Sequence, residues 1–206
     1  MPTLLQVDSS PLATSISREL TQEFVRNWSL AHPDGEVIRR DLAANPPKPI
    51  DTLWVGAAYT PSEQQTPEHR AALAKSDELI GELERADEYV FGVPMHNFGI
   101  PSVLKLWIDL VVRAGRTFSY GENGPRGLLS GKKATVLTAS GGVYTPGTGA
   151  AAMNHVDPYL KTILGFVGVT NATFINVPGV AQVSSGKVDR QEFLKPTFER
   201  VRSAVA

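Results

Sequence analysis

The stretch 88-EYVFGVPMHNFGIPSVLKLWIDLV-111 runs from an expected strand through a loop into an expected helix. Glu88–Val93 is a short apolar run stopped by Pro94, which is typical of a buried strand rather than a helix. After Pro101, apolar residues recur at helical spacing: Val103, Leu104, Trp107, Ile108 and Val111. A strand that passes through a short loop into an amphipathic helix is the repeating unit of α/β proteins.

Further units of the same kind lie on both sides of this stretch. The expected strands are Thr3–Val7, Glu36–Asp41, Lys133–Thr138 and Thr173–Val177. The expected helices are Ser17–His32, a long helix starting at Pro67 with Thr66 as N-cap, Ala151–Phe166 and Gln191–Val205. Phe118–Gly124 is expected to be a hairpin, because Asn-Gly favours tight primed turns. Leu42–Gln65 has no clear period and is expected to be a long loop, either functional or covered by a partner.

The alternation of strands and helices predicts an α/β fold with a parallel sheet covered by helices on both faces. Five strands suit the flavodoxin-like order 2-1-3-4-5. Because no repeat or linker divides the chain, residues 1–206 are expected to form a single domain. Ligands of such folds bind beyond the carboxyl ends of the strands, which directs attention to the loops after strands one, three and four.

Composition narrows the possible partners. The chain has 206 residues, enough for a full hydrophobic core, and its formal net charge is -1 with no basic run. Nucleic acids and anionic membranes need clustered Lys and Arg, so we expect neither as a partner. The absence of cysteine excludes disulfides and thiolate chemistry, and we expect no metal. No signal-peptide pattern and no bilayer-length apolar stretch occurs, so we expect a cytoplasmic protein.

Hydroxyl side chains crowd the start of the first expected helix: Ser9, Ser10, Thr14, Ser15 and Ser17. The N-terminus of a helix offers free N–H groups and partial positive charge, which attract phosphate, and Arg18 could add charge. The alternative is that one serine caps the helix and the others are solvated. The residues alone leave both interpretations open.

The loops after strands three and four suit a flat ring with polar edges, such as a flavin. Met95 and Phe98 can supply an apolar wall, Asn97 a polar edge, and two prolines stiffen the segment. In Ala139–Gly142, paired glycines let backbone N–H groups approach a ring closely, where they would face the N1–O2 edge. Read singly, the first segment could be a connector with an incidental His96, and the second a simple turn.

The same segments carry a family resemblance. Residues 94–109 resemble the Pro-Met-Tyr-Asn-Phe-x-Ile-Pro-x-x-Leu-Lys run of FMN-dependent NADH-azoreductases, part of the wider flavodoxin-like NAD(P)H quinone reductases. Residues 113–120, 124–128 and 164–169 extend the resemblance over essentially the full length. The chain departs from the family at His96, usually Tyr, and at Ala139–Gly142, often Ser-Arg-Gly-Gly. Because the family's contacts there are partly through backbone, FMN binding should survive both departures.

The resemblance implies one FMN per subunit, with NADH or NADPH as co-substrate. It implies a ping-pong transfer of hydride through flavin N5 to quinones and azo compounds, with two rounds cleaving an azo bond to two amines and no catalytic side chain. The implied FMN contacts are Ser10, Ser15, Ile16, Ser17, Met95, His96, Asn97, Phe98, Ala139, Ser140, Gly141 and Gly142. It also implies a homodimer with shared active sites, whose substrate pocket is framed by Phe98 and by Tyr120 and Phe166 of the second subunit. Trp54 and Tyr59, in the Leu42–Gln65 loop, would cap the partner's site.

Two other classes of protein share this fold and are alternative interpretations of the sequence. A flavodoxin-type FMN electron carrier, without substrate turnover of its own, is the main alternative, but carriers are usually strongly acidic and this chain is nearly neutral. A receiver domain would need an acid pair after strand one and an Asp after strand three. Here Asp8 is single and strand three ends in Val93-Pro94.

Overall fold

The computed structural model describes residues 1–205. Its strands are β1 (Thr3–Asp8), β2 (Glu36–Asp41), β3 (Glu88–Pro94), β4 (Phe118–Gly121), β5 (Gly124–Gly127), β6 (Lys133–Ser140) and β7 (Asn171–Pro178). Its α-helices are α1 (Ile16–Ala31), α2 (Thr52–Tyr59), α3 (Pro67–Arg85), α4 (Ser102–Val111), α5 (Asp157–Phe166), α6 (Ala181–Ser184) and α7 (Arg190–Ser203). Short 3-10 turns occupy Ser62–Gln64 and Ala151–Met153.

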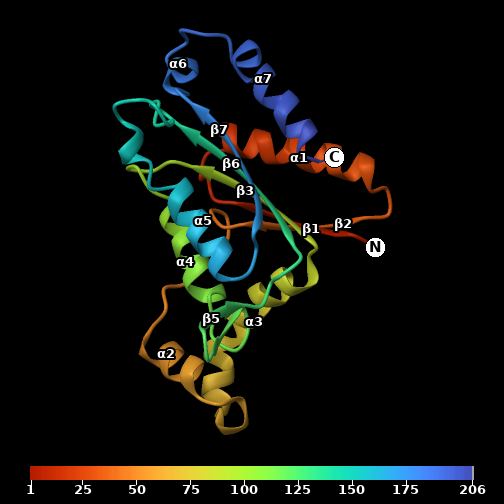
Figure 1. Cartoon of the computed structure of the whole chain (residues 1–206), viewed down its shortest axis with the longest axis vertical. Coiled ribbons are helices and arrows are strands. Elements are labelled where there is room, and N and C mark those ends of the chain that lie inside the picture. Colours follow the sequence, from red (N-terminus) through yellow and green to blue (C-terminus); the bar gives the residue numbers. More distant parts are fainter. Residues whose placement is uncertain (206) are drawn as a thin grey trace.

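Five strands form one parallel sheet in the order β2-β1-β3-β6-β7 (Figure 1). With the separate β4–β5 hairpin set aside, this is the order 2-1-3-4-5, and the flavodoxin-like prediction is confirmed. All five expected sheet strands are present, and they differ from the expected ranges by at most two residues at an end.

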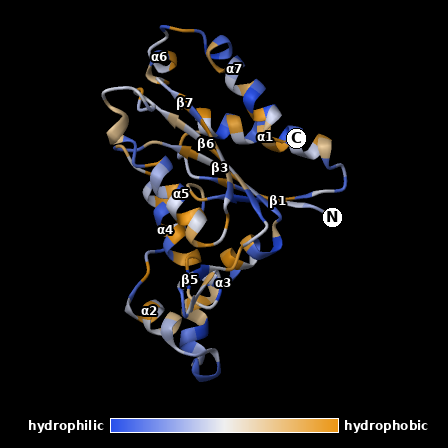
Figure 2. Ribbon diagram, in the orientation of Figure 1, coloured by the Kyte–Doolittle hydropathy of each residue, from blue (hydrophilic) through white to orange (hydrophobic). Residues whose placement is uncertain are grey.

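Helices cover both faces of the sheet and divide the core into two clusters. On one face, α1 and α7 pack Phe24, Trp28 and Leu194 against the strands. On the other face, α3, α4 and α5 bring Leu79 and Trp107 to the sheet. Figure 2 shows hydrophobic and hydrophilic residues mixed along α1, α4 and α7, as expected of helices with one face on a core. In the part of the chain that the structure describes, no helix is long and apolar enough to cross a membrane.

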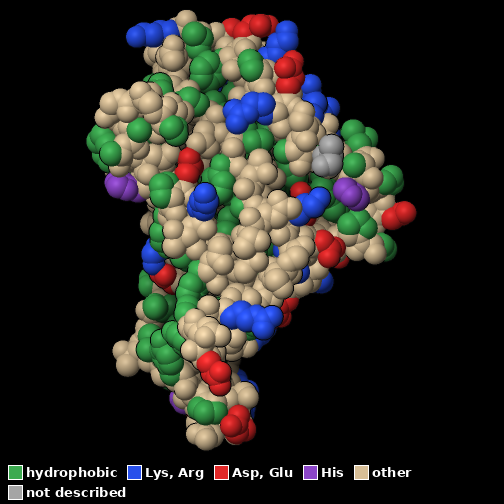
Figure 3. Space-filling model, viewed as in Figure 1, with side chains coloured by type: hydrophobic (Ala, Val, Ile, Leu, Met, Phe, Trp, Pro, Cys, Tyr) green, Lys and Arg blue, Asp and Glu red, His purple; other side chains and the backbone are tan. Residues whose placement is uncertain are grey.

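Two expected elements differ from the structure. Leu42–Gln65 is not a structureless loop, because it contains α2. The N-cap residue of this helix is Asp51, whose side chain accepts a hydrogen bond from the Trp54 backbone N–H at 2.8 Å. This helix is short and apolar around its circumference, so it gives no helical period in the sequence. Leu53 and Tyr59 are exposed on it, and hydrophobic side chains gather over α2 at the lower left of Figure 3.

The helix expected over Ala151–Phe166 begins only at Asp157. Asn154 Oδ1 accepts the backbone N–H groups of Val156 and Asp157 at 3.0 and 3.2 Å, which fixes the turn before the helix. Pro158 then stands in the first turn, where its missing N–H costs nothing.

The hairpin is confirmed, but its turn is not of the expected primed type. Only Gly124 of this turn has a positive φ, of 100°, whereas a primed turn needs positive φ at its central residues Glu122 or Asn123. The short helix α6 was not expected, because four residues are too few to show a period.

Candidate functional site

The sheet register brings the three candidate loops to one edge. Asp8 at the end of β1 pairs with Gly92 of β3, and Pro94 at the end of β3 pairs with Ala139 of β6. The Ser9 backbone N–H donates to the Gly92 carbonyl at 3.2 Å, and the Met95 N–H donates to the Ala139 carbonyl at 2.8 Å. The loops after β1, β3 and β6 therefore lie side by side, as the parallel topology requires.

The loop after β1 ends in an open helix N-terminus. Ser15 is the N-cap residue of α1, yet its side chain makes no capping hydrogen bond and lies 3.0 Å from Ser17 Oγ. Within residues 1–205, no acceptor receives the backbone N–H groups of Ile16, Ser17 and Arg18. The capping alternative is therefore wrong for Ser15, and three N–H groups stay available to an anion.

The other two serines of this loop lie inside it. Ser9 is fully buried and its hydroxyl donates to the Gly92 carbonyl at 2.8 Å, so it ties the loop to β3. Ser10 is also buried, and its Oγ accepts the Leu12 N–H at 3.3 Å, which leaves the hydroxyl hydrogen free to donate.

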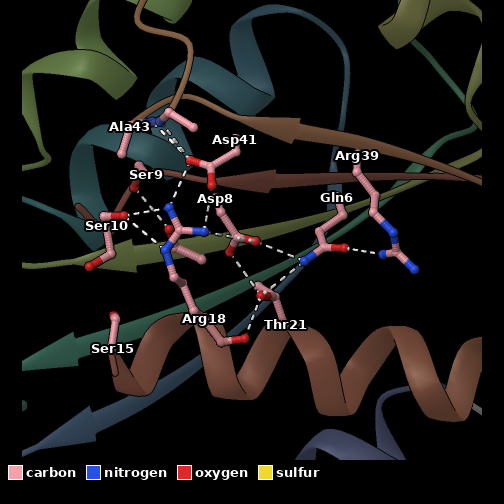
Figure 4. A network of polar contacts seen from close by, with 12 residues as sticks. Gln6, Asp8, Ser9, Ser10, Ser15, Arg18, Thr21, Arg39, Asp41 and Ala43 are labelled. Carbon is pink, nitrogen blue, oxygen red and sulfur yellow. Dashed lines mark hydrogen bonds and ion pairs between the residues drawn. The ribbon is translucent and has the colours of Figure 1, made fainter. Parts of the chain in front are cut away.

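Arg18 does not face the phosphate position as a free charge. Its guanidinium contacts both oxygens of Asp41 and the backbone carbonyl of Ser10 (Figure 4). Asp8 lies 4.0 Å from it on the other side. The sequence-based idea that Arg18 could add charge is therefore wrong, because its charge is neutralised by carboxylates that the sequence could not place.

Burial and pairing move the pKa values of these two carboxyls in opposite directions. Burial raises the pKa of Asp8, although hydrogen bonds from Thr21 and Gln6 and the nearby Arg18 oppose the rise. The hydrogen bond from Arg18 lowers the pKa of Asp41 below its ordinary value. Asp41 is thus the charged partner that holds Arg18.

The loop after β3 is strained at two residues. Asn97 and Phe98 have φ values of 47° and 69°, in the left-handed region that favours glycine. His96 and Gly99 exchange backbone hydrogen bonds of 3.0 Å in both directions, which closes a tight turn around them. Strain at consecutive non-glycine residues persists only where the surroundings fix it, and such residues cluster at binding sites.

Phe98 joins this loop to the loop after β6. Phe98 is 39% exposed, and its ring packs edge-on against Tyr144, with ring centroids 5.8 Å apart. The Ser140 hydroxyl donates to the Gly142 carbonyl at 2.9 Å, and a Cβ on Gly142 would come within 2.8 Å of the Tyr144 hydroxyl. Gly142 is therefore needed for this packing, whereas Gly141 has open space where a Cβ would stand. Sequence reasoning missed Tyr144, although an aromatic two residues beyond Gly-Gly was a usable signal.

A polar cluster lies next to the loops after β3 and β6, and sequence reasoning missed it too. Met95, Ser140, Tyr144 and Asp157 are among the residues that line a cavity of about 10 Å³. Asp157 Oδ2 accepts from the side-chain amides of Asn154 and Asn176, at 3.0 and 2.5 Å. Its Oδ1 is buried without a hydrogen-bond partner among the described residues. Only the fold brings this carboxylate, from the start of α5, next to the loop after β6.

The residues proposed to frame a substrate do not meet within one chain. Tyr120 and Phe166 both pack against Phe118, with ring centroids 5.4 and 4.7 Å apart. Phe118 follows the carboxyl end of α4, whereas Phe98 precedes its amino end. Ten helical residues span roughly 15 Å, so the two groups stand at opposite ends of α4.

Three features of the described chain fit a flavin mononucleotide. The first-turn N–H groups of α1 and nearby serine hydroxyls match a phosphate. The rigid turn containing Phe98 and the half-buried Met95 match a flat apolar ring. The backbone of Ala139–Gly142 lies next to that turn and matches the polar edge of the ring.

Comparison with known proteins finds relatives that are named as FMN-dependent. A family model described as flavodoxin-like fold matches residues 2–200. An FMN-dependent NADH:quinone oxidoreductase of Acidobacterium capsulatum is 58% identical over the full length of both chains. An FMN-dependent NADH:quinone oxidoreductase 3 of Burkholderia lata is 47% identical, over 98% of this chain and 99% of its own.

Solved structures agree in fold. An azoreductase from Bacillus anthracis has a TM-score of 0.89 at 29% identity, covering 100% of this chain and 99% of its own. An FMN-dependent NADH-azoreductase of the same species, in complex with FMN, has a TM-score of 0.87 at 26% identity, covering 100% and 98%. The chain belongs to the flavodoxin-like family that includes the FMN-dependent NADH:quinone oxidoreductases.

Proposed function

We propose that this chain is an FMN-dependent NADH:quinone oxidoreductase that also reduces azo compounds, with residues 1–206 forming one FMN-binding domain. The observation that carries the proposal is the convergence of the three loops at the carboxyl edge of β1, β3 and β6. The full-length identity of 58% to a relative of that name supports it independently.

Each part of the cofactor has a proposed set of contacts. The phosphate is held by the loop after β1 and the start of α1, through Ser10, Ser15, Ile16 and Ser17. The ring is held by the loops after β3 and β6, through Met95, His96, Asn97, Phe98, Ala139, Ser140, Gly141 and Gly142. Bound FMN supplies hydride transfer at N5 between a nicotinamide and a quinone or azo compound, and we propose that the two substrates use one position in turn.

The protein contributes position and shape. The reciprocal hydrogen bonds of His96 and Gly99 fix the turn that presents Phe98, so the wall of the pocket is formed before a ligand arrives. The edge-on contact of Phe98 with Tyr144 supports that wall from the loop after β6. Backbone N–H groups near Gly141 and Gly142 would stabilise negative charge at the polar edge of the ring.

The proposal includes a homodimer with shared active sites. Tyr59 of α2 is 78% exposed and Tyr120 of the hairpin is 73% exposed, so each offers an aromatic ring that a second subunit would cover. Because Tyr120 and Phe166 lie at the far end of α4 from Phe98, they reach a flavin only from a second subunit. The exposed apolar surface of α2 would be covered by the same partner.

An electron carrier is the alternative, and the net charge of -1 favours an enzyme. The test is an absorbance spectrum of the purified protein, followed by steady-state rates with NADH and NADPH against a quinone and an azo dye. We expect bound flavin and turnover, with parallel double-reciprocal lines that indicate a ping-pong sequence. FMN-loaded protein without turnover would favour the carrier, and protein that refuses added FMN would overturn both.

A further inference from the structure

The Arg18 side chain links three elements: α1, β2 and the loop after β1 (Figure 4). It projects from the first turn of α1, and its Nε and Nη2 both donate to the Ser10 carbonyl, at 2.8 and 2.5 Å. Nη1 and Nη2 also donate to the two carboxylate oxygens of Asp41, at 2.8 and 2.7 Å. Asp41 is the last residue of β2, so the strand, the helix and the loop after β1 are joined at one guanidinium.

These contacts use almost all the hydrogen-bonding capacity of Arg18. Nε donates once, Nη1 once and Nη2 twice, which engages four of its five N–H groups. The side chain is only 16% exposed, and Asp8 lies on its remaining side at 4.0 Å. A guanidinium held in this way keeps a single uncommitted N–H group, on Nη1 near Asp8, and its charge is balanced by Asp41.

The Ser10 carbonyl explains what the arrangement accomplishes. A carbonyl oxygen carries partial negative charge and repels a phosphate when the two face each other. Two N–H groups of Arg18 hold this oxygen, while Asp41 fixes the guanidinium as a planar fork. Asp41 is itself held by the backbone N–H groups of Ala43 and Ala44, at 3.0 and 3.1 Å.

We propose that Arg18 and Asp41 are positioning residues for the cofactor phosphate: they fix the Ser10 carbonyl so that the loop presents hydroxyl and N–H donors to the anion. This inference rests on the proposed FMN site. It differs from an ordinary arginine–phosphate contact, because the positive charge alone is insufficient and the fork geometry is required.

The experiment titrates apoprotein with FMN and, separately, with riboflavin, which has the same ring and no phosphate, while flavin fluorescence is recorded. The variants are Asp41→Asn and Arg18→Lys, the latter keeping the charge and losing the fork. Glu36→Gln is the matched control, because Glu36 lies at the other end of β2 and pairs with Arg85 at 3.1 Å, remote from the loop.

We expect Asp41→Asn and Arg18→Lys to raise the FMN dissociation constant by about tenfold, which is the loss of one charge-assisted hydrogen bond. The riboflavin dissociation constant and the behaviour of Glu36→Gln should stay unchanged. Unchanged FMN affinity in Asp41→Asn, or wild-type affinity in Arg18→Lys, would overturn the inference. So would an equal loss of both flavins, since a merely structural role would weaken them together. Wild-type protein that binds neither flavin would overturn the proposed function itself.

Discussion

Ser15 is a helix N-cap whose side chain is left uncommitted, and this makes it a selective test of the phosphate position. Asp and Asn are both as good as Ser at an N-cap, so either replacement keeps α1 stable. Asp alone adds a negative charge beside the proposed phosphate position. We expect Ser15→Asp to weaken FMN binding at least about tenfold relative to Ser15→Asn, measured by fluorescence titration. Equal affinities of the two variants for FMN would contradict the proposal that the phosphate binds at the N-terminus of α1.

Asp8 gives a pH-dependent prediction at the residue scale. Because burial raises its pKa above the ordinary 3.8, the folded state binds the proton more tightly than the unfolded state. The stability contributed by Asp8 is therefore present below pH 3.8 and is lost as pH rises through the raised pKa. Asp8→Asn does not titrate.

The free energy of unfolding of Asp8→Asn minus that of the wild type should therefore increase as pH rises from about 4 to 7. Urea unfolding at several pH values measures this difference. A difference that stays constant across this pH range would contradict a raised pKa of Asp8 in the folded state. Asp41 acts in the opposite sense, because its lowered pKa makes its contribution fade as pH falls.

At the scale of elements, Gly92 permits the close approach of β1, β3 and α1 behind the site. A Cβ at Gly92 would come within 2.5 Å of Asp8 Oδ1, 2.9 Å of Thr21 Cγ2 and 3.1 Å of the Ser17 carbonyl. Gly92→Ala should lower the free energy of unfolding by about 1–3 kcal/mol through overpacking.

Gly81 provides the control for that substitution. It lies in α3, and a Cβ there would meet nothing within 4 Å. Gly81→Ala should therefore be neutral or stabilise the protein by about 0.5–1 kcal/mol, since alanine favours a helix. Thermal unfolding of both variants checks the pair, and equal melting temperatures would show that the packing at Gly92 is not critical.

At the scale of the whole molecule, the exposed apolar face of α2 is the test of assembly. A charge at Tyr59 would be buried in the proposed dimer, so Tyr59→Glu should give a monomer by analytical ultracentrifugation. That monomer should retain FMN, because all three loops belong to one chain, and lose quinone turnover with its partner's aromatic residues.

Leu30 supplies the matched control for Tyr59. It is 73% exposed at the end of α1, on the other face of the sheet, so Leu30→Glu should leave the assembly unchanged. A Tyr59→Glu protein that sediments like the wild type would place the partner elsewhere, and a monomeric wild type would remove the shared-site proposal.

The sequence alone determined the order of strands and helices, the sheet order and the three loops at the carboxyl edge of the sheet. The reason is that, within each segment, the apolar residues that become buried recur at the spacing of a strand or of a helix. The predicted ends of the strands Glu88–Pro94 and Asn171–Pro178 lie within two residues of the observed ends. In contrast, the start of α5 was predicted wrongly and α2 was not predicted at all. Those two depend on side-chain caps, from Asn154 and Asp51, rather than on periodic burial.

Only the tertiary structure decided which groups face one another. Arg18 meets Asp41 because the crossover returns β2 beside β1, a pairing separated by 23 residues that no local pattern records. Likewise, α4 sets Phe98 and Tyr120 at opposite ends, and this separation is the observation behind the proposed shared site. Patterns of hydrophobicity report how deeply a residue is buried, but the partner of a charged or aromatic side chain is set by segments that the fold brings from elsewhere in the chain.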